Sequence, residues 1–129
     1  MTAAEAWPQL AASDAMLVDV RTQAEWLFVG LPDVSAHGKQ PLLLEWTTLE
    51  GTPNPQFISQ LQQVAAADAH LFMLCRSGVR SHAAGLAALA AGFSRVTNIS
   101  DGFEGDLNAD GQRKKLGGWC AAGLPWRQR

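Results

Sequence analysis

Residues 75–81, CRSGVRS, place one of the chain's two cysteines between an apolar stretch and a helical pattern. A strand ending at Cys75, a tight loop containing Gly78 and a helix just after it would turn several backbone N–H groups toward one point. Amides grouped at a helix N-terminus favour an anion, so we expect Cys75 to be held as a reactive thiolate. Arg76 and Arg80 add positive charge at the rim, suited to an oxyanion substrate. The segment therefore predicts a cysteine nucleophile that attacks an anionic substrate.

Two chemistries use a cysteine in such a loop: attack on phosphate esters and transfer of sulfur. Cysteine phosphatases use a loop one residue longer between the cysteine and the arginine, which wraps a tetrahedral phosphate. In this chain only residues 76–79 separate Cys75 from Arg80. Phosphatases of this type often carry a histidine directly before the cysteine, whereas this chain has Leu74 there. The smaller ring suits a single sulfur atom better than a phosphoryl group. A plain packing role for Cys75 is the simpler alternative, but it leaves the flanking arginines and glycine unexplained.

The elements that must position this cysteine alternate along the chain. Short apolar runs predict strands at 16–20, 70–75 and 95–99, and the run at 42–46 is compatible with a strand or a turn. Strands that alternate with helices indicate a parallel sheet covered on both faces, with sites at the carboxyl ends of its strands. Four helical patterns alternate with these strands: one at the N-terminus, one at 22–29, one ending at about residue 65 and one beginning at about residue 79. Asn54 and Pro55 form the start signal of the third helix, and Gly92 is the expected end of the fourth.

Several local pairings follow from these patterns. Thr2 and Glu5 form a capping-box pattern for a first helix that we expect Pro8 to keep short. Thr22 is the expected cap of the second helix.

Asp19 and Arg21 are expected to tie the end of a strand to a neighbouring loop, and Glu25 lies one helical turn from Arg21 as its expected partner. Ser81 is expected to donate a hydrogen bond to the loop or to the thiolate, and His82 to lie on the helix surface. For the helix after the loop, the inner face is expected to consist of Val79, Ala83, Leu86, Ala90 and Phe93.

Composition and charge limit the class of protein. The 129 residues fit one domain, 1–129, and the formal net charge of −2 argues against nucleic acid or an anionic membrane as the main partner. No apolar run is long enough to span a membrane, and the N-terminal stretch lacks a signal-peptide pattern, so we expect a cytoplasmic protein. Two cysteines, Cys75 and Cys120, make neither a disulfide framework nor a zinc site at this spacing. Cys120 is interpreted as a bystander.

The loop CRSGVRS resembles the active-site loop of the rhodanese family of sulfurtransferases. The segment LVDVRTQAEW at 17–26 resembles the family's first signature, and VTNISDGFEGD at 96–106, followed by GGW, resembles its closing strand and loop. The resemblance implies a three-layer α/β/α sandwich around a mainly parallel sheet of about five strands. It also implies that Cys75 carries sulfane sulfur as a persulfide. The loop that would hold this sulfur and bind the substrate consists of Arg76, Ser77, Gly78, Val79, Arg80 and Ser81.

The same resemblance implies a function and its partners. Thiosulfate or a similar small anionic donor would give its outer sulfur to Cys75, and cyanide, a thiol or an acceptor protein would remove it, with ping-pong kinetics. No metal or organic cofactor is required. The alternative is a module that carries the persulfide to one dedicated protein, or only binds proteins, with little turnover of small molecules. The sequence leaves both open.

Other residues of chemical interest receive plainer interpretations. Trp46, Phe103 and Trp119 are candidates to wall a pocket, but a packing role is preferred for each. Residues 106–111, DLNADG, match the first half of a calcium-binding loop. The ligand expected at its twelfth position would be Gly117, which has no carboxylate, so the segment is interpreted as a turn.

Overall fold

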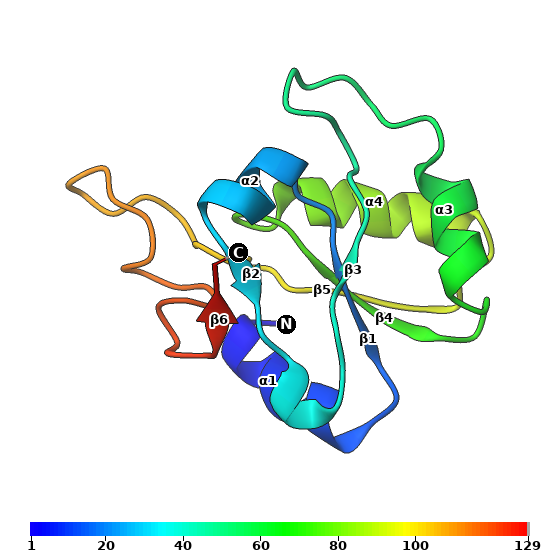
Figure 1. Ribbon diagram of the computed structural model, residues 1–129, viewed down its shortest axis with the longest axis horizontal. Coiled ribbons are helices and arrows are strands. Elements are labelled where there is room, and N and C mark those ends of the chain that lie inside the picture. Colours follow the sequence, from blue (N-terminus) through cyan, green and yellow to red (C-terminus); the bar gives the residue numbers. More distant parts are fainter. Residues whose placement is uncertain (129) are drawn as a thin grey trace.

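A parallel sheet forms the centre of the protein, whose computed structural model describes residues 1–128 (Figure 1). Its strand order is β3-β1-β4-β5, and every neighbouring pair is parallel. The sheet therefore has four strands, where the resemblance stated above implied about five. The strands are β1 (Met16–Asp19), β3 (Leu42–Leu43), β4 (His70–Leu74) and β5 (Arg95–Asn98). A separate antiparallel pair joins β2 (Leu31–Pro32) to β6 (Trp126–Arg127), and the sequence patterns predicted neither strand.

The helices lie on both sides of the sheet and make it the middle of three layers, as expected. α3 and α4 cover one face and α1 the other, while α2 lies near the carboxyl ends of the strands (Figure 1). Among the helices of residues 1–128, none combines the length and apolar character that a membrane crossing requires. The helices are α1 (Ala3–Ala12), α2 (Gln23–Phe28), the short 3-10 helix η1 (Ser35–His37), α3 (Phe57–Val64) and α4 (Val79–Ala90).

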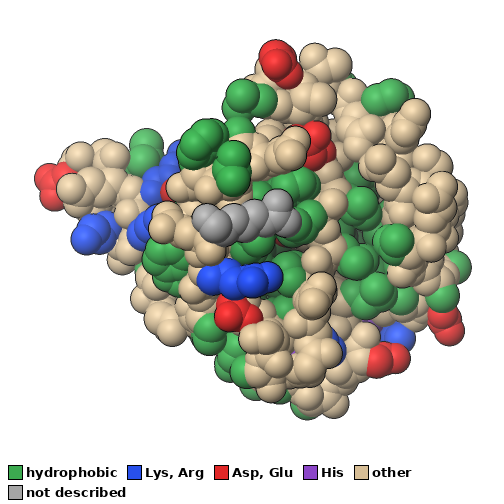
Figure 2. Space-filling model, in the orientation of Figure 1, with side chains coloured by type: hydrophobic (Ala, Val, Ile, Leu, Met, Phe, Trp, Pro, Cys, Tyr) green, Lys and Arg blue, Asp and Glu red, His purple; other side chains and the backbone are tan. Residues whose placement is uncertain are grey.

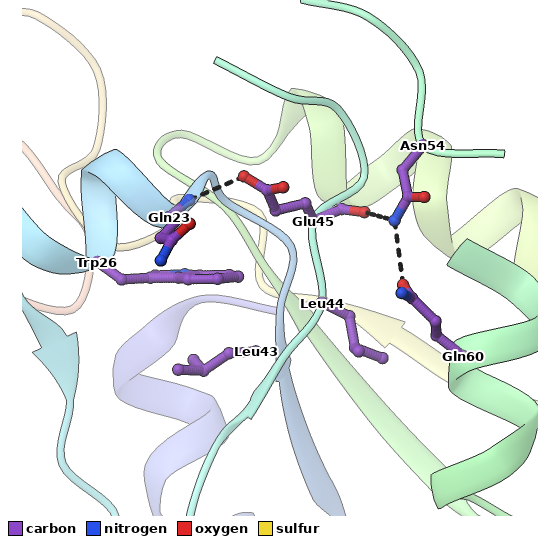
Figure 3. Close-up of a pocket in the computed structure, with 7 residues that line it drawn as sticks. All are labelled: Gln23, Trp26, Leu43, Leu44, Glu45, Asn54 and Gln60. Atoms are coloured by element: carbon purple, nitrogen blue, oxygen red, sulfur yellow. Dashed lines mark hydrogen bonds between the residues drawn. The ribbon is translucent and has the colours of Figure 1, made fainter. Parts of the chain in front are cut away.

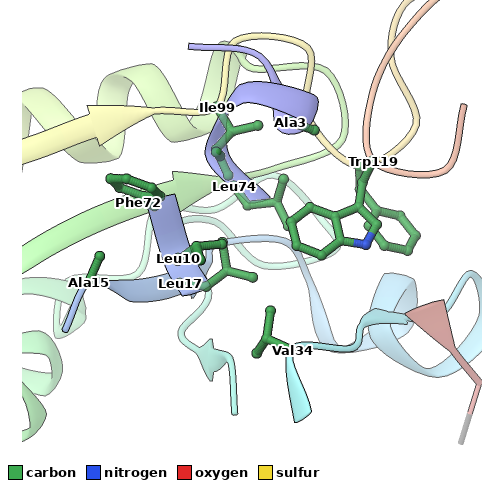
Figure 4. Close-up of a cluster of buried hydrophobic side chains, with 11 residues drawn as sticks. Ala3, Leu10, Ala15, Leu17, Val34, Phe72, Leu74, Ile99 and Trp119 are labelled. Atoms are coloured by element: carbon green, nitrogen blue, oxygen red, sulfur yellow. The ribbon is translucent and has the colours of Figure 1, made fainter. Parts of the chain in front are cut away.

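The core lies in two clusters, one on each face, because side chains alternate along every strand. On β4, Leu71 and Met73 pack with α3 and α4, whereas Phe72 and Leu74 pack on the α1 side together with Trp119 (Figure 4). All five side chains are 0% exposed. The central strand is thus buried on both faces, as its unbroken apolar run predicted.

The three aromatic residues considered as pocket walls pack against other side chains of the core. Phe103 and Trp119 are 0% exposed, and Trp46 is half-buried against Phe57 with ring centroids 5.2 Å apart. Their packing role is therefore confirmed.

Proline does not end the first helix. The capping box of Thr2 and Glu5 is present, but α1 continues past Pro8 to Ala12, so the expected early end is wrong. Pro8 removes one backbone donor and frees the carbonyl of the exposed residue Ala4, which water can satisfy.

Lys39 holds the end of α1 and the residues just after it. Its ammonium donates to the backbone carbonyls of Leu10, Ser13 and Ala15 at 2.6, 2.7 and 2.7 Å.

The third helix begins later than its start signal suggested. Asn54 accepts the N–H of Gln56 on its side-chain oxygen and forms a turn, so α3 starts at Phe57. Phe57 and Leu61 are buried, whereas Val64 is 48% exposed.

The expected inner face of the fourth helix is wrong. Val79 and Leu86 are 76% and 55% exposed, and of the expected set only Phe93, which follows the helix, is fully buried. Small residues let the helix approach the sheet closely: a Cβ added to Gly85 would lie 3.2 Å from Val96 Cγ1. The face that packs on the sheet consists of Ser81, Ala84, Gly85 and Ala88.

Candidate active site

The Cys75 loop, residues 75–81, runs from the end of β4 into the first turn of α4. Gly78 is the N-cap of α4 and has a φ of +104°, a conformation that side chains with a Cβ rarely adopt. A Cβ at this position would also lie only 2.2 Å from the backbone oxygen of Ser100. Glycine is therefore required there both by the turn and by the close approach of the neighbouring segment.

Two donors point at the sulfur of Cys75. The backbone N–H of Gly78 lies 3.1 Å from Sγ, and the Ser81 hydroxyl lies 3.2 Å from Sγ. The hydroxyl also lies 3.2 Å from the Gly78 carbonyl, so its single proton serves one of the two at a time. Both donors can therefore hydrogen-bond the sulfur, and Cys75 itself is only 1% exposed.

The segment after β5 fixes the shape of the loop from outside. The Asn98 amide donates to the Gly78 carbonyl at 3.1 Å, and Phe103 N–H donates to the Cys75 carbonyl at 2.8 Å. The carbonyl of Arg76 accepts the N–H of Glu104 at 2.9 Å. These three carbonyls of the loop are thus satisfied by the neighbouring segment, which holds the loop in the shape that points the Gly78 N–H at the sulfur.

A fully buried ion pair ties the end of β1 to this region. Arg21 and Asp19 are both 0% exposed, and their nearest side-chain atoms lie 2.7 Å apart. Arg21 also donates to the Gly30 carbonyl at 2.8 Å, and its guanidinium lies 4.3 Å from the centre of the Phe103 ring. The expected tie between strand end and neighbouring loop is therefore present, but the partner of Arg21 is Asp19 and not Glu25.

Glu25 instead pairs with Arg80 of the loop. Both terminal nitrogens of Arg80 donate to the Glu25 carboxylate, at 2.6 and 3.0 Å. Burial opposes ionisation of Glu25, yet the hydrogen bonds and charge of Arg80 outweigh it, so the pKa of Glu25 lies below its usual value. The hydrogen bond to Glu25 in turn raises the pKa of Arg80. Arg80 therefore joins the loop to α2, and Glu25 neutralises its charge.

A hollow of about 500 Å³ lies over the loop and is lined by Arg76, Arg80, Glu104 and Arg113, among others. Arg76 is exposed, and no ion pair within residues 1–128 involves it or Arg113. Arg113 Nη1 donates to the Gly105 carbonyl at 2.8 Å, which orients the guanidinium. Sequence reasoning missed Arg113 because it lies far beyond the loop motif. The only signal was the run of basic residues at 113–115.

The remaining residues singled out by the sequence have simpler surroundings. Ser77 is half-buried, while Val79 and His82 are exposed, so His82 lies on the helix surface as expected. Burial raises the pKa of the half-buried Cys120 thiol. Asn108 Oδ1 accepts the N–H groups of two later residues, so the 106–111 segment is a turn as interpreted.

Comparison with known proteins identifies the family. Residues 2–109 match the family of the rhodanese-like domain. The chain belongs to the rhodanese-like family. An uncharacterized protein of Rickettsia prowazekii is 37% identical over 115 residues, which is 89% of this chain and 85% of that protein.

Solved structures agree with this assignment. The crystal structure of Rv0390 from M. tuberculosis is 45% identical, with a TM-score of 0.93, and the match covers 100% of this rhodanese-like chain and 96% of that one. The solution structure of a polysulfide-sulfur transferase homodimer from Wolinella succinogenes shares the fold, with a TM-score of 0.66 and 21% identity. That match covers 100% of this chain and 77% of the other.

Proposed function

We propose that this rhodanese-like protein is a sulfurtransferase that carries sulfane sulfur on Cys75 as a persulfide. The observation that carries the proposal is the pair of donors on Sγ, Gly78 N–H and the Ser81 hydroxyl, inside a loop at the carboxyl end of a central parallel strand. The sulfur-transferase name of the W. succinogenes relative supports the same class of reaction.

The reaction has two half-reactions. The Cys75 thiolate attacks the outer sulfur of thiosulfate, the S–S bond of the donor breaks, and sulfite leaves with the bonding electron pair. An acceptor thiolate or cyanide then attacks the outer sulfur of the persulfide, and the Cys75 thiolate leaves with the electron pair. Each step moves one sulfur atom between nucleophiles and needs no further oxidant or cofactor.

The charges of the hollow give the two arginines of the loop different roles. Because Glu25 occupies both terminal nitrogens of Arg80, Arg80 holds the loop, and Arg76 is the loop cation that meets an anionic donor. Arg113, on the same hollow, adds a second cation. We propose that these two guanidinium groups bind the sulfonate end of thiosulfate.

The experiment is intact-mass measurement after incubation with thiosulfate. The protein should become heavier by one sulfur atom, and cyanide should reverse the change. Cys75→Ser should abolish the adduct and Cys120→Ser should leave it. An adduct that persists in Cys75→Ser, or that maps to Cys120, would exclude the proposal.

Steady-state kinetics test the arginine roles. Arg76→Ala should raise the KM for thiosulfate about fivefold with a smaller change in kcat, since an exposed ion pair contributes up to roughly 1 kcal/mol. Arg113→Ala should also raise the KM for thiosulfate. Lys115→Ala is the matched control, because Lys115 is an exposed cation of the same segment that does not line the hollow. An equal effect of all three variants would point to general electrostatic attraction instead.

A further inference from the structure

A second hollow, of about 390 Å³, adjoins the one over the Cys75 loop. The two share Thr48 and Leu49, and the second is also lined by Leu27 and Phe28 of α2. These three hydrophobic side chains are unusually open to solvent: Leu27 is 49%, Phe28 76% and Leu49 69% exposed. Exposed apolar side chains gathered beside a site mark a surface for another protein.

A third hollow, of about 360 Å³, continues from the second and shares Gln23 and Glu45 with it. Figure 3 shows Glu45 between the Trp26 ring on one side of this hollow and the side-chain amides of Asn54 and Gln60 on the other. Glu45 accepts the backbone N–H of Gln23 at 2.9 Å, which fixes its carboxylate at the junction of the two hollows. Trp26 is only 6% exposed, so the group at this junction that a partner can reach is the Glu45 carboxylate, which suits the side chain of arginine or lysine.

The second and third hollows carry negative charge. Glu45 and Glu50 both line the second hollow, and neither takes part in an ion pair within residues 1–128. Hydrophobic side chains gather over α2, with acidic side chains on and below the loop beside it (Figure 2). We call this surface the acidic groove, and it consists of Trp26, Leu27, Phe28, Glu45, Leu49 and Glu50.

We propose that the acidic groove binds the sulfur acceptor, a protein whose acceptor cysteine lies in a segment with apolar and basic side chains. The proposal rests on the proposed function of Cys75. Apolar side chains of the segment would cover Phe28 and Leu49, its basic side chains would meet Glu45 and Glu50, and its thiol would enter the hollow over the loop. The acceptor thiolate would attack the outer sulfur of the persulfide, and the Cys75 thiolate would leave with the bonding electron pair.

The arrangement of charges favours such a partner over other occupants. Cyanide and small thiols are too small to use a surface that runs through three hollows. Nucleic acid would be repelled by Glu45 and Glu50. The loop end of the surface is basic through Arg76 and Arg113, which suits an anionic donor, whereas the far end is acidic and suits a basic acceptor. Donor and acceptor would thus contact different ends of one continuous surface.

The test uses two labelled synthetic peptides as probes. Each carries one cysteine between a leucine and a phenylalanine, and they differ only in having three arginines or three glutamates at the same positions. Fluorescence anisotropy measures their binding to the Cys75→Ser chain, so that the readout does not depend on sulfur transfer. The arginine peptide should bind at least about tenfold more tightly, because two or more ion pairs reverse sign between the probes. Added salt should reduce the difference.

Substitutions in the groove should remove this preference. Phe28→Ser should weaken binding of the arginine peptide about tenfold, as loss of an aromatic contact at the centre of an interface does. Glu50→Arg should weaken binding of the arginine peptide about fivefold and strengthen binding of the glutamate peptide. Both side chains are exposed, so neither change should unfold the protein. The matched controls are Leu86→Ser and Asp14→Arg, which alter exposed residues outside the groove.

The outcomes separate this proposal from the proposed function. Equal binding of the two peptides, or equal losses in the control variants, would overturn the groove as a docking site. A chain that dimerises until Phe28→Ser makes it monomeric would also overturn it, because the groove would then bind a second copy. Peptide preference without any thiosulfate adduct on Cys75 would support the docking surface and exclude sulfur transfer. Preference together with faster transfer of sulfur to the arginine peptide would support both.

Discussion

The Glu25–Arg80 ion pair allows a direct test of how the Cys75 loop is held. Glu25→Gln keeps an oxygen for the N–H of Thr22, since glutamine also serves in a capping box. It removes the negative charge opposite Arg80, whose nitrogens lie 2.6 and 3.0 Å from the carboxylate. The matched control is Glu5→Gln, because Glu5 makes the same capping box with Thr2 but has no ion pair within residues 1–128.

The expected loss follows from the burial of the pair. The side chains of Arg80 and Glu25 are 25% and 19% exposed, which places the pair between surface and interior. Exposed pairs contribute roughly 0.2–1 kcal/mol, whereas breaking a buried one costs about 3–5 kcal/mol. We therefore expect Glu25→Gln to lower the free energy of unfolding at neutral pH by about 2 kcal/mol. Glu5→Gln should lower the free energy of unfolding much less, because Glu5 is exposed.

In acid, the difference in the free energy of unfolding between wild type and Glu25→Gln should disappear. Folding lowers the pKa of Glu25, so the pair stabilises the protein fully above the unfolded carboxyl value of about 4.3. The contribution is lost as the pH falls through the lower pKa of the folded state. Urea unfolding followed by circular dichroism, from neutral pH down to about pH 3, measures this for wild type and both variants. Equal losses in the two variants, or a difference that stays constant into acid, would refute the reasoning.

Three further predictions concern single residues. Gly78→Ala should abolish sulfur transfer because its Cβ would lie 2.2 Å from the Ser100 oxygen. Gly92→Ala has a similar φ of +105°, but no atom of residues 1–128 lies within 4 Å of its Cβ, so it should lower stability and leave transfer nearly unchanged. Lys39→Met should lower the free energy of unfolding in urea by about 2 kcal/mol, because three carbonyls lose a charged donor. Cys120 should react with iodoacetamide at about pH 8 more slowly than a free cysteine, and faster after unfolding, because burial raises its pKa.

The features that could be predicted from the sequence are those whose cause is local. The capping box of Thr2 and Glu5 and the cap at Thr22 need only residues close in sequence, and both are present. The position of Cys75 at a strand end follows from an apolar run that stops beside a polar loop. Neither prediction requires knowledge of what lies across the sheet.

The features that were wrong depend on residues far apart in the chain. Glu25 lies close to Arg21 in sequence, but Asp19 already holds Arg21, and Arg80 reaches Glu25 from 55 residues away. The inner face of α4 was also misplaced, because apolar side chains occur all around this alanine-rich helix. There the close fit of Gly85 to β5, rather than the size of the apolar side chains, decides which face is buried.

The Cys75 loop illustrates the same distinction within the candidate site. Its residue types point to a thiolate in a ring of donors, yet its shape depends on the segment 98–104, which supplies hydrogen bonds to three of its carbonyls. A Cβ at Gly102 would lie 2.5 Å from the backbone of Arg76, so at this point the segment and the loop approach each other through their backbones. Because hydrogen bonds from the segment 98–104 hold the loop that carries these donors, the chemistry of a seven-residue motif is set in part by residues outside it.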